Sequence, residues 1–88
     1  MNRITVKRTD GYSVSDDYIE EAIRRLGMFE DAYEALLGER LRLPVDLENM
    51  RMQGKEKTVR YKETMAQKLI NNNIILFFEK YGLKYVFK

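Results

Sequence analysis

A periodic stripe of apolar residues over residues 16–38 constrains this chain more than any other feature. The apolar side chains recur at steps of three and four, the spacing of one face of an α-helix. Ser15 or Asp17 is placed to accept free amide hydrogens at the start of this helix, and Gly38 to close its end. The sequence therefore predicts an amphipathic helix from Asp16 to Gly38. Its apolar face comprises Ile19, Ala22, Ile23, Leu26, Phe29, Tyr33 and Leu36 or Leu37.

The size and composition favour one small domain, residues 1–88, without a deep ligand cavity. A chain of 88 residues buries about 60–65% of the surface that its unfolded form exposes. The sequence contains no cysteine and no histidine, which excludes disulfides, thiolate metal sites and imidazole catalysis. We therefore expect no enzyme activity, no cofactor, no metal site and no small-molecule ligand.

The first fourteen residues have the pattern of a strand followed by a tight turn. Residues 3–7 alternate, with Ile4 and Val6 on one face, as in a half-buried strand. Asp10-Gly11 is the strongest turn dipeptide in the chain. If residues 12–14 pair back, a short hairpin forms; otherwise this region is a strand and a loop.

The middle of the chain is predicted to break the helical pattern. Pro44 restricts the residue before it to extended geometry, so we expect the helical region to end there. Asp46 would then cap a short helix through Met50. Residues 53–57 are polar and contain a glycine, which predicts a loop, and the alternation over residues 58–62 suits a strand.

The last third of the chain allows two interpretations. Residues 65–70 have helical spacing, and the triplet Asn71 to Asn73 then predicts a break, because asparagine favours caps and turns. In the preferred interpretation a second helix runs from Ile74 to Tyr81, Gly82 stops it, and residues 84–87 form a final strand. In the alternative, residues 74–78 and 84–87 are the two strands of a hairpin.

Together these elements predict an α+β fold. A long N-terminal amphipathic helix and shorter C-terminal helices would pack on a small, mainly antiparallel sheet containing residues 3–7, 58–62 and 84–87. The predicted core residues are Ile4, Val6, Ile19, Ile23, Leu26, Phe29, Val59, Leu69, Ile74, Phe77 and Val86.

Charge is distributed unevenly along the chain. Residues 1–44 carry seven Arg or Lys and nine Asp or Glu, a net charge of −2, whereas residues 45–88 carry nine and five, a net charge of +4. Lysine and arginine neutralise phosphates, and tyrosine stacks on exposed bases, so the second half of the chain has the residue types of a nucleic-acid-binding surface. Glu56 and Glu63 reduce its positive charge. The candidate nucleic-acid-binding residues are Arg51, Lys55, Lys57, Arg60, Tyr61, Lys62 and Lys68.

The other functional patterns favour protein interaction. Glu30, Asp31 and Glu34 could be read as a cation site, but a solvated face is preferred because no further ligands are evident. A helix-turn-helix around the asparagine triplet conflicts with the five apolar residues 74–78, because a recognition helix shows polar side chains to DNA. The excess of apolar and aromatic residues instead favours docking to a protein partner or self-association.

The leading functional hypothesis is thus a non-enzymatic protein-interaction module, and the alternative is a nucleic-acid-binding accessory domain that uses the basic segment 51–68. No segment approaches the roughly 20 apolar residues of a membrane span. We therefore expect no membrane association and a cytoplasmic location.

Several short motifs resemble the openings of uncharacterised proteins carried by prophages and conjugative elements of Gram-positive bacteria. They cover about half of the chain. After the Glu30-Asp31 pair, where those proteins continue toward a Thr-Gly turn, this chain stays helical. The resemblance implies a bacterial mobile-element accessory protein and brings no known activity. The motifs are Arg3-x-Thr5-x-x-Arg8-x-Asp10-Gly11, Ala22-Ile23-x-Arg25-Leu26, Phe29-Glu30-Asp31, Lys57-Thr58-Val59-x-Tyr61-Lys62 and Tyr81-Gly82-Leu83.

Overall fold

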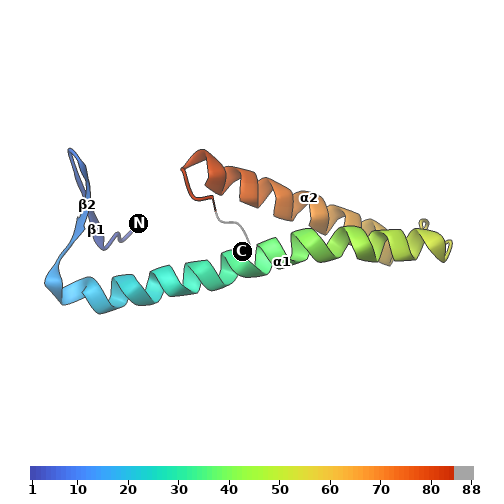
Figure 1. The fold of residues 1–88 in the computed structure, drawn as a ribbon, viewed down its shortest axis with the longest axis horizontal. Coiled ribbons are helices and arrows are strands. Elements are labelled where there is room, and N and C mark those ends of the chain that lie inside the picture. The colour runs from blue at the N-terminus through green and yellow to red at the C-terminus, as the bar shows by residue number, and fades with distance from the viewer. Residues whose placement is uncertain (85–88) are drawn as a thin grey trace. The chain divides into compact units, whose positions relative to one another are not determined.

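A computed structural model describes residues 1–84 and contains a small hairpin and two helices (Figure 1). Strands β1 (Thr5–Arg8) and β2 (Gly11–Val14) are followed by a 3-10 turn η1 (Asp16–Tyr18), helix α1 (Ile19–Met52) and helix α2 (Val59–Lys80). The chain divides into an N-terminal unit, Met1–Ala32, and a C-terminal unit, Tyr33–Lys88, so the boundary falls within α1. The fold is broadly α+β, as the sequence predicts.

Of the two alternatives for the first fourteen residues, the hairpin is the one that forms, with its turn at Thr9 and Asp10 and with Gly11 as the first residue of β2. β1 and β2 pair antiparallel, with Thr5 opposite Val14 and Arg8 opposite Gly11. Gly11 has a φ of +152°, which glycine adopts without the steric cost that a Cβ would bring. Residues 58–62 belong to no strand, and residues 85–87 of the predicted final strand lie outside the described part of the chain. The sheet of the described residues therefore has two strands.

The long N-terminal helix is confirmed, but its predicted end is wrong. Ser15 accepts a hydrogen bond from the Asp17 amide (3.4 Å), as the capping pattern predicts, whereas α1 continues past Gly38 and through Pro44 to Met52. The predicted short helix beginning at Asp46 is part of α1. Proline in a helix interior costs about 3 kcal/mol, and burial of Leu43 and Leu47 on either side opposes that cost.

Helix α2 occupies a region for which the sequence predicts a strand, a helix, a break and a second helix. The predicted strand over residues 58–62 is wrong, because the Thr58 hydroxyl accepts from the Tyr61 amide (3.2 Å) and caps a helix that begins at Val59. The predicted break at residues 71–73 is wrong, and so is the alternative strand over residues 74–78, because α2 runs unbroken to Lys80. The second helix is confirmed for residues 74–80.

Both helices end at a glycine in the left-handed conformation. Gly54 has a φ of +70° and Gly82 a φ of +82°, and Gly82 is the predicted stop of the last helix. The Lys55 amide donates to the Met50 carbonyl (2.9 Å), and the Leu83 amide donates to the Phe78 carbonyl (3.0 Å). These are the six-to-one bonds of Schellman motifs, which satisfy carbonyls left free at a helix end.

In the C-terminal unit, α2 runs back antiparallel along the second half of α1 (Figure 1). Three contacts between the helices fix the direction, because positions that rise along α1 meet positions that fall along α2. The fully buried residues of the described chain all lie in this unit and are mostly apolar. The contacts are Tyr33 with Phe78, Glu39 with Asn71 and Arg51 with Tyr61. The buried residues are Tyr33, Leu37, Leu43, Leu47, Asn71 and Ile75.

Most of the predicted core residues are exposed, and the predicted packing of the helices on a sheet is not confirmed. The sheet of the described residues is limited to the two strands of the hairpin, and the helices of the C-terminal unit pack on each other through a different set of side chains. Ile4 and Phe29 are half-buried, and Val86 lies outside the described residues. The exposed members of the predicted core are Val6, Ile19, Ile23, Leu26, Val59, Leu69, Ile74 and Phe77.

One polar side chain, Asn71, lies inside the helix pair at 2% exposure. Its amide donates to the Glu39 carboxylate across the helices and accepts from Gln67 Nε2 (2.7 Å) within α2. A buried amide is stable only when it is hydrogen-bonded. The interhelical bond therefore favours the one register in which residue 71 meets residue 39.

An exposed ion-pair cluster lies in the N-terminal unit, at the start of α1. Glu21 accepts hydrogen bonds from Arg24 (2.5 Å) and Arg25 (2.9 Å). These bonds, chiefly the one from Arg24, lower the pKa of Glu21 to about 2. Because all three side chains face solvent, the cluster contributes little to stability.

Glycine-to-alanine substitutions should change stability in opposite directions at two positions of the C-terminal unit. Gly38 lies inside α1 with open space where a Cβ would stand, so Gly38→Ala should raise the free energy of unfolding by about 0.5–1 kcal/mol. Gly54 is left-handed, so Gly54→Ala should lower it by about 1–2 kcal/mol. Urea unfolding at one fixed protein concentration measures both; changes of the same sign would contradict the assigned helix boundaries.

Substitutions of Asn71 should separate charge from packing. Asn71→Asp places a carboxylate against Glu39 and should lower the free energy of unfolding at pH 7 by about 1–3 kcal/mol. Burial and the neighbouring carboxylate favour the protonated form of the new carboxyl in the folded state, so the loss should shrink as the pH falls toward about 4 and should be absent below it. Asn71→Leu should cost less, because Glu39 is 39% exposed and remains hydrated. Equal losses for both variants at pH 7 would contradict this role of the Asn71–Glu39 bond.

Candidate functional site

The structure offers two candidate surfaces, both in the C-terminal unit. The first is the basic tip, formed by cationic side chains at the turn between α1 and α2. The second is the outer stripe, a row of apolar side chains on the side of α2 that faces away from α1. The basic tip consists of Arg51, Lys55, Lys57, Arg60 and Lys62, and the outer stripe of Val59, Ala66, Ile70, Ile74, Phe77 and Tyr81.

The basic tip gathers most of the predicted nucleic-acid-binding residues. They lie on the last turn of α1, the connection and the first turn of α2. The Thr58 hydroxyl donates to the Lys55 carbonyl (2.7 Å) and accepts from the Tyr61 amide, which holds the connection against α2. Lys68 is different: it is half-buried and lies two turns beyond the tip, so the structure does not bring it together with the others.

Two predicted members of the nucleic-acid set contact each other. Arg51 Nε donates to the Tyr61 hydroxyl (3.1 Å), and Arg51 Nη1 also pairs with Glu48 (3.3 Å). Tyr61 is half-buried, so its ring is less available for stacking on a base than the sequence alone suggests. The remaining cations of the basic tip are exposed.

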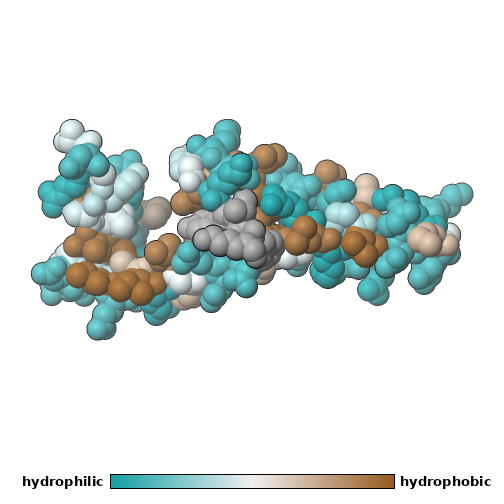
Figure 2. Space-filling model, in the orientation of Figure 1, coloured by the Kyte–Doolittle hydropathy of each residue, from teal (hydrophilic) through white to brown (hydrophobic). Residues whose placement is uncertain are grey.

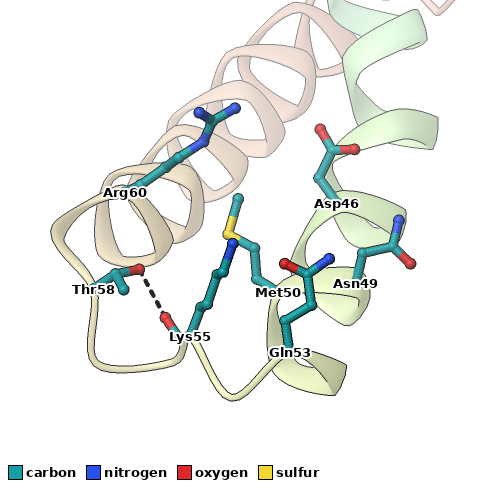
Figure 3. Close-up of a pocket in the computed structure, with 7 residues that line it drawn as sticks. All are labelled: Asp46, Asn49, Met50, Gln53, Lys55, Thr58 and Arg60. Atoms are coloured by element: carbon teal, nitrogen blue, oxygen red, sulfur yellow. Dashed lines mark hydrogen bonds between the residues drawn. The ribbon is translucent and has the colours of Figure 1, made fainter.

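An open cleft of about 500 Å³ lies between the helix ends at the basic tip (Figure 3). Figure 3 shows Lys55 and Met50 extending into the space between the two helices. Lys55 and Arg60 are the predicted cations that line it, and Asp46 lines the opposite side, where it pairs with Arg42 (2.5 Å). The full lining is Asp46, Asn49, Met50, Gln53, Lys55, Thr58 and Arg60.

The basic tip coincides with the positive end of a helix. The first turn of α2 contains no acidic residue, although acidic side chains are the ones that stabilise a helix N-terminus. Arg60 and Lys62 add positive charge at that end. The tip therefore favours anions through general electrostatics, without a fixed constellation of groups around one ligand.

The outer stripe gives α2 a second apolar side. Its residues recur at steps of three, four and seven, which keeps them on one face of a helix. Val59 is 70% exposed, Ile70 51% and Phe77 56%. The Phe77 and Tyr81 rings lie 5.3 Å apart, and Phe77 also contacts Phe78 at 5.9 Å. Since Phe78 packs on Tyr33, aromatic rings extend from the helix interface to the surface.

Further apolar side chains widen this surface. Met65, Leu69 and Leu76 are exposed and lie beside the outer stripe on α2. On the face drawn in Figure 2, brown apolar surface alternates with teal polar surface along the described helices. A helix that is apolar on opposite sides is normally buried on both. Within the described part of the C-terminal unit, α1 covers one side of α2.

The predicted division of residues 58–81 into a strand and two helices hides the outer stripe. The signal is present in the sequence: the same three-and-four spacing continues through the asparagine triplet from Val59 to Tyr81. Reading those residues as one helix separates the apolar side chains into an inner and an outer row.

The described residues give no support to a metal site. No group of three or more Asp or Glu side chains within residues 1–84 is arranged to hold an ion. This holds also for Glu30, Asp31 and Glu34, the acidic cluster noted in the sequence. Within the same residues, neither helix combines the length and apolar content needed to cross a membrane.

Comparisons of the chain with protein-family models, with curated proteins and with solved structures gave no match.

Proposed function

We propose that this protein is a non-enzymatic protein-interaction module and that the outer stripe of α2 is its docking surface. The observation that carries the proposal is that α2 is apolar on two opposite sides, while α1 covers one of them. Contiguous exposed apolar surface on a folded domain commonly marks a protein interface.

The energetics of a two-helix unit favour this proposal. Burying one Ile or Phe side chain contributes about 1.5–3 kcal/mol, and helices in proteins derive most of their stability from packing of an apolar face. The described C-terminal unit buries Ile75 fully on α2 and leaves Ile70 and Phe77 more than half exposed. A partner that covers the outer stripe would therefore gain binding energy from side chains already held by the helix.

The biological setting that we propose is an accessory protein of a bacterial mobile element, acting in the cytoplasm. The support for this setting is the resemblance of the short motifs to prophage and conjugative-element proteins. Such a role would use docking to another protein and needs no catalytic group.

A photocrosslinking amino acid at position 70 should capture a protein partner. Ile70 lies at the centre of the outer stripe, so a photoreactive phenylalanine analogue there should give a covalent protein adduct upon irradiation in host extract. Glu56 is exposed in the connection and provides the matched control position, which should give little adduct. Gel mobility and mass spectrometry measure the adduct. Absence of any protein adduct from position 70 would contradict the proposed docking surface.

The basic tip supports a second proposal, a nucleic-acid-binding accessory domain. The specific observation is that Lys55, Lys57, Arg60 and Lys62 gather at the positive end of α2 without an acidic residue in its first turn. Phosphate groups are the anions that such a surface would attract regardless of base sequence.

A salt titration tests this second proposal. If the basic tip binds duplex or single-stranded DNA, the logarithm of the binding constant should fall linearly with the logarithm of salt concentration, and each lost phosphate contact should reduce the slope by about 1. Lys55→Gln with Arg60→Gln should reduce it by about 2, whereas Lys84→Gln, at an exposed position beyond the other end of α2, should leave it unchanged. Absence of binding at low salt, or an equal effect of Lys84→Gln, would reject this role of the basic tip.

A further inference from the structure

We infer that the outer stripe binds a second copy of this chain, with the two α2 helices antiparallel. This inference rests on the proposed docking function of the same surface and specifies the partner. The observation that carries it is the order of residues along the stripe: large and small side chains, and opposite charges, are placed so that the stripe complements itself when one copy is reversed.

Side-chain size gives the first complementarity. If Ile70 and Ile74 lie on either side of a two-fold axis, Ala66 and Phe77 lie at nearly equal distances from that axis. An antiparallel partner then places its Phe77 beside Ala66, where the small side chain leaves room for the ring. A parallel partner would place Phe77 against the partner's Phe77 and leave a gap between the two Ala66 methyl groups, and both crowding and voids destabilise a helix interface.

Charge gives the second complementarity, independent of size. Glu63 is the charged residue that falls within the three-and-four spacing of the outer stripe, between Val59 and Ala66. The same antiparallel register places Glu63 at the level of the partner's Lys80 and Tyr81, near the other end of α2. A parallel register would instead place Glu63 beside the partner's Glu63, and such a like-charge pair is unfavourable.

The length of α2 suits this arrangement. Its 22 residues span about 33 Å, and the outer stripe runs over the whole helix. Each α1 stays on the inner side of its own α2, so the dimer contains four helices, and the two α2 helices occupy its centre. That arrangement covers both apolar sides of α2, as four-helix assemblies do.

Sedimentation equilibrium tests whether the chain self-associates through this surface. The protein should be a dimer, and Ile70→Glu should raise the dissociation constant on the order of 100-fold, because it removes an apolar contact and adds a charge in both copies. Leu41→Glu, on an exposed position of α1, is the matched control and should leave dimerisation unchanged. Circular dichroism establishes that both variants keep their helices.

A charge exchange tests the register. Glu63→Lys and Lys80→Glu should each raise the dissociation constant about threefold to tenfold, and the double variant should restore it, because the opposite charges again face each other across the interface. A double variant as weak as the two single changes combined would overturn the pairing of Glu63 with the partner's Lys80.

Cysteine cross-linking tests whether the two α2 helices of the dimer run antiparallel. The sequence contains no cysteine, so each introduced thiol is the only one in its chain. In the antiparallel dimer the two Tyr81 positions lie about 27 Å apart, so Tyr81→Cys alone should not form a dimer disulfide. A mixture of Glu63→Cys and Tyr81→Cys proteins should form one between the two variants. A disulfide from Tyr81→Cys alone would show a parallel dimer and overturn the inference.

These experiments distinguish a failure of self-association from a failure of the proposed docking function. A chain that stays monomeric at high concentration overturns self-association. If the photoreactive residue at position 70 then captures a different protein, the docking function stands with another partner. If it captures nothing, both proposals fail.

Discussion

The packing of α2 along the second half of α1 is the interaction on which the described C-terminal unit depends. Tyr33 and Phe78 meet at one end of the pair and Arg51 and Tyr61 at the other. Between them, the buried Asn71 amide donates to the partly exposed carboxylate of Glu39. Apolar contacts provide the attraction, and they tolerate sliding of one helix along the other. The hydrogen bond does not, so it selects one register.

That register determines which residues of α2 remain outside. Once Asn71 and Ile75 face α1, geometry places Ile70 and Phe77 on the other side of the helix. The exposed apolar surface is thus a direct result of the inner packing. The same turn of chain that brings the helices together also collects cations at the basic tip. An apolar face and a cationic end are therefore separate surfaces of one helix pair, and their binding chemistries differ.

Local signals in the sequence were sufficient wherever the conformation depends on neighbouring residues. The turn next to Gly11, the cap at Ser15 and the stop at Gly82 follow from backbone and side-chain chemistry within a few residues. The cationic character of the tip also follows from sequence, because its residues are close together along the chain. The outer stripe could have been found from spacing, once residues 59–80 are read as one helix.

The amino-acid sequence by itself determined a strand and a turn near Gly11, the presence of a long helix, the capping residues before it and the glycine that ends the last helix, and tertiary contacts were not needed for any of these. Tertiary structure decided the continuation of α1 through Pro44, the continuity of α2 through Asn71 and the helical state of residues 59–62. Proline and asparagine have local preferences against a helix interior. Those preferences were overridden because Leu43, Leu47 and Ile75 are buried and the Asn71 amide is hydrogen-bonded between two helices, contacts that exist only when distant parts of the chain meet.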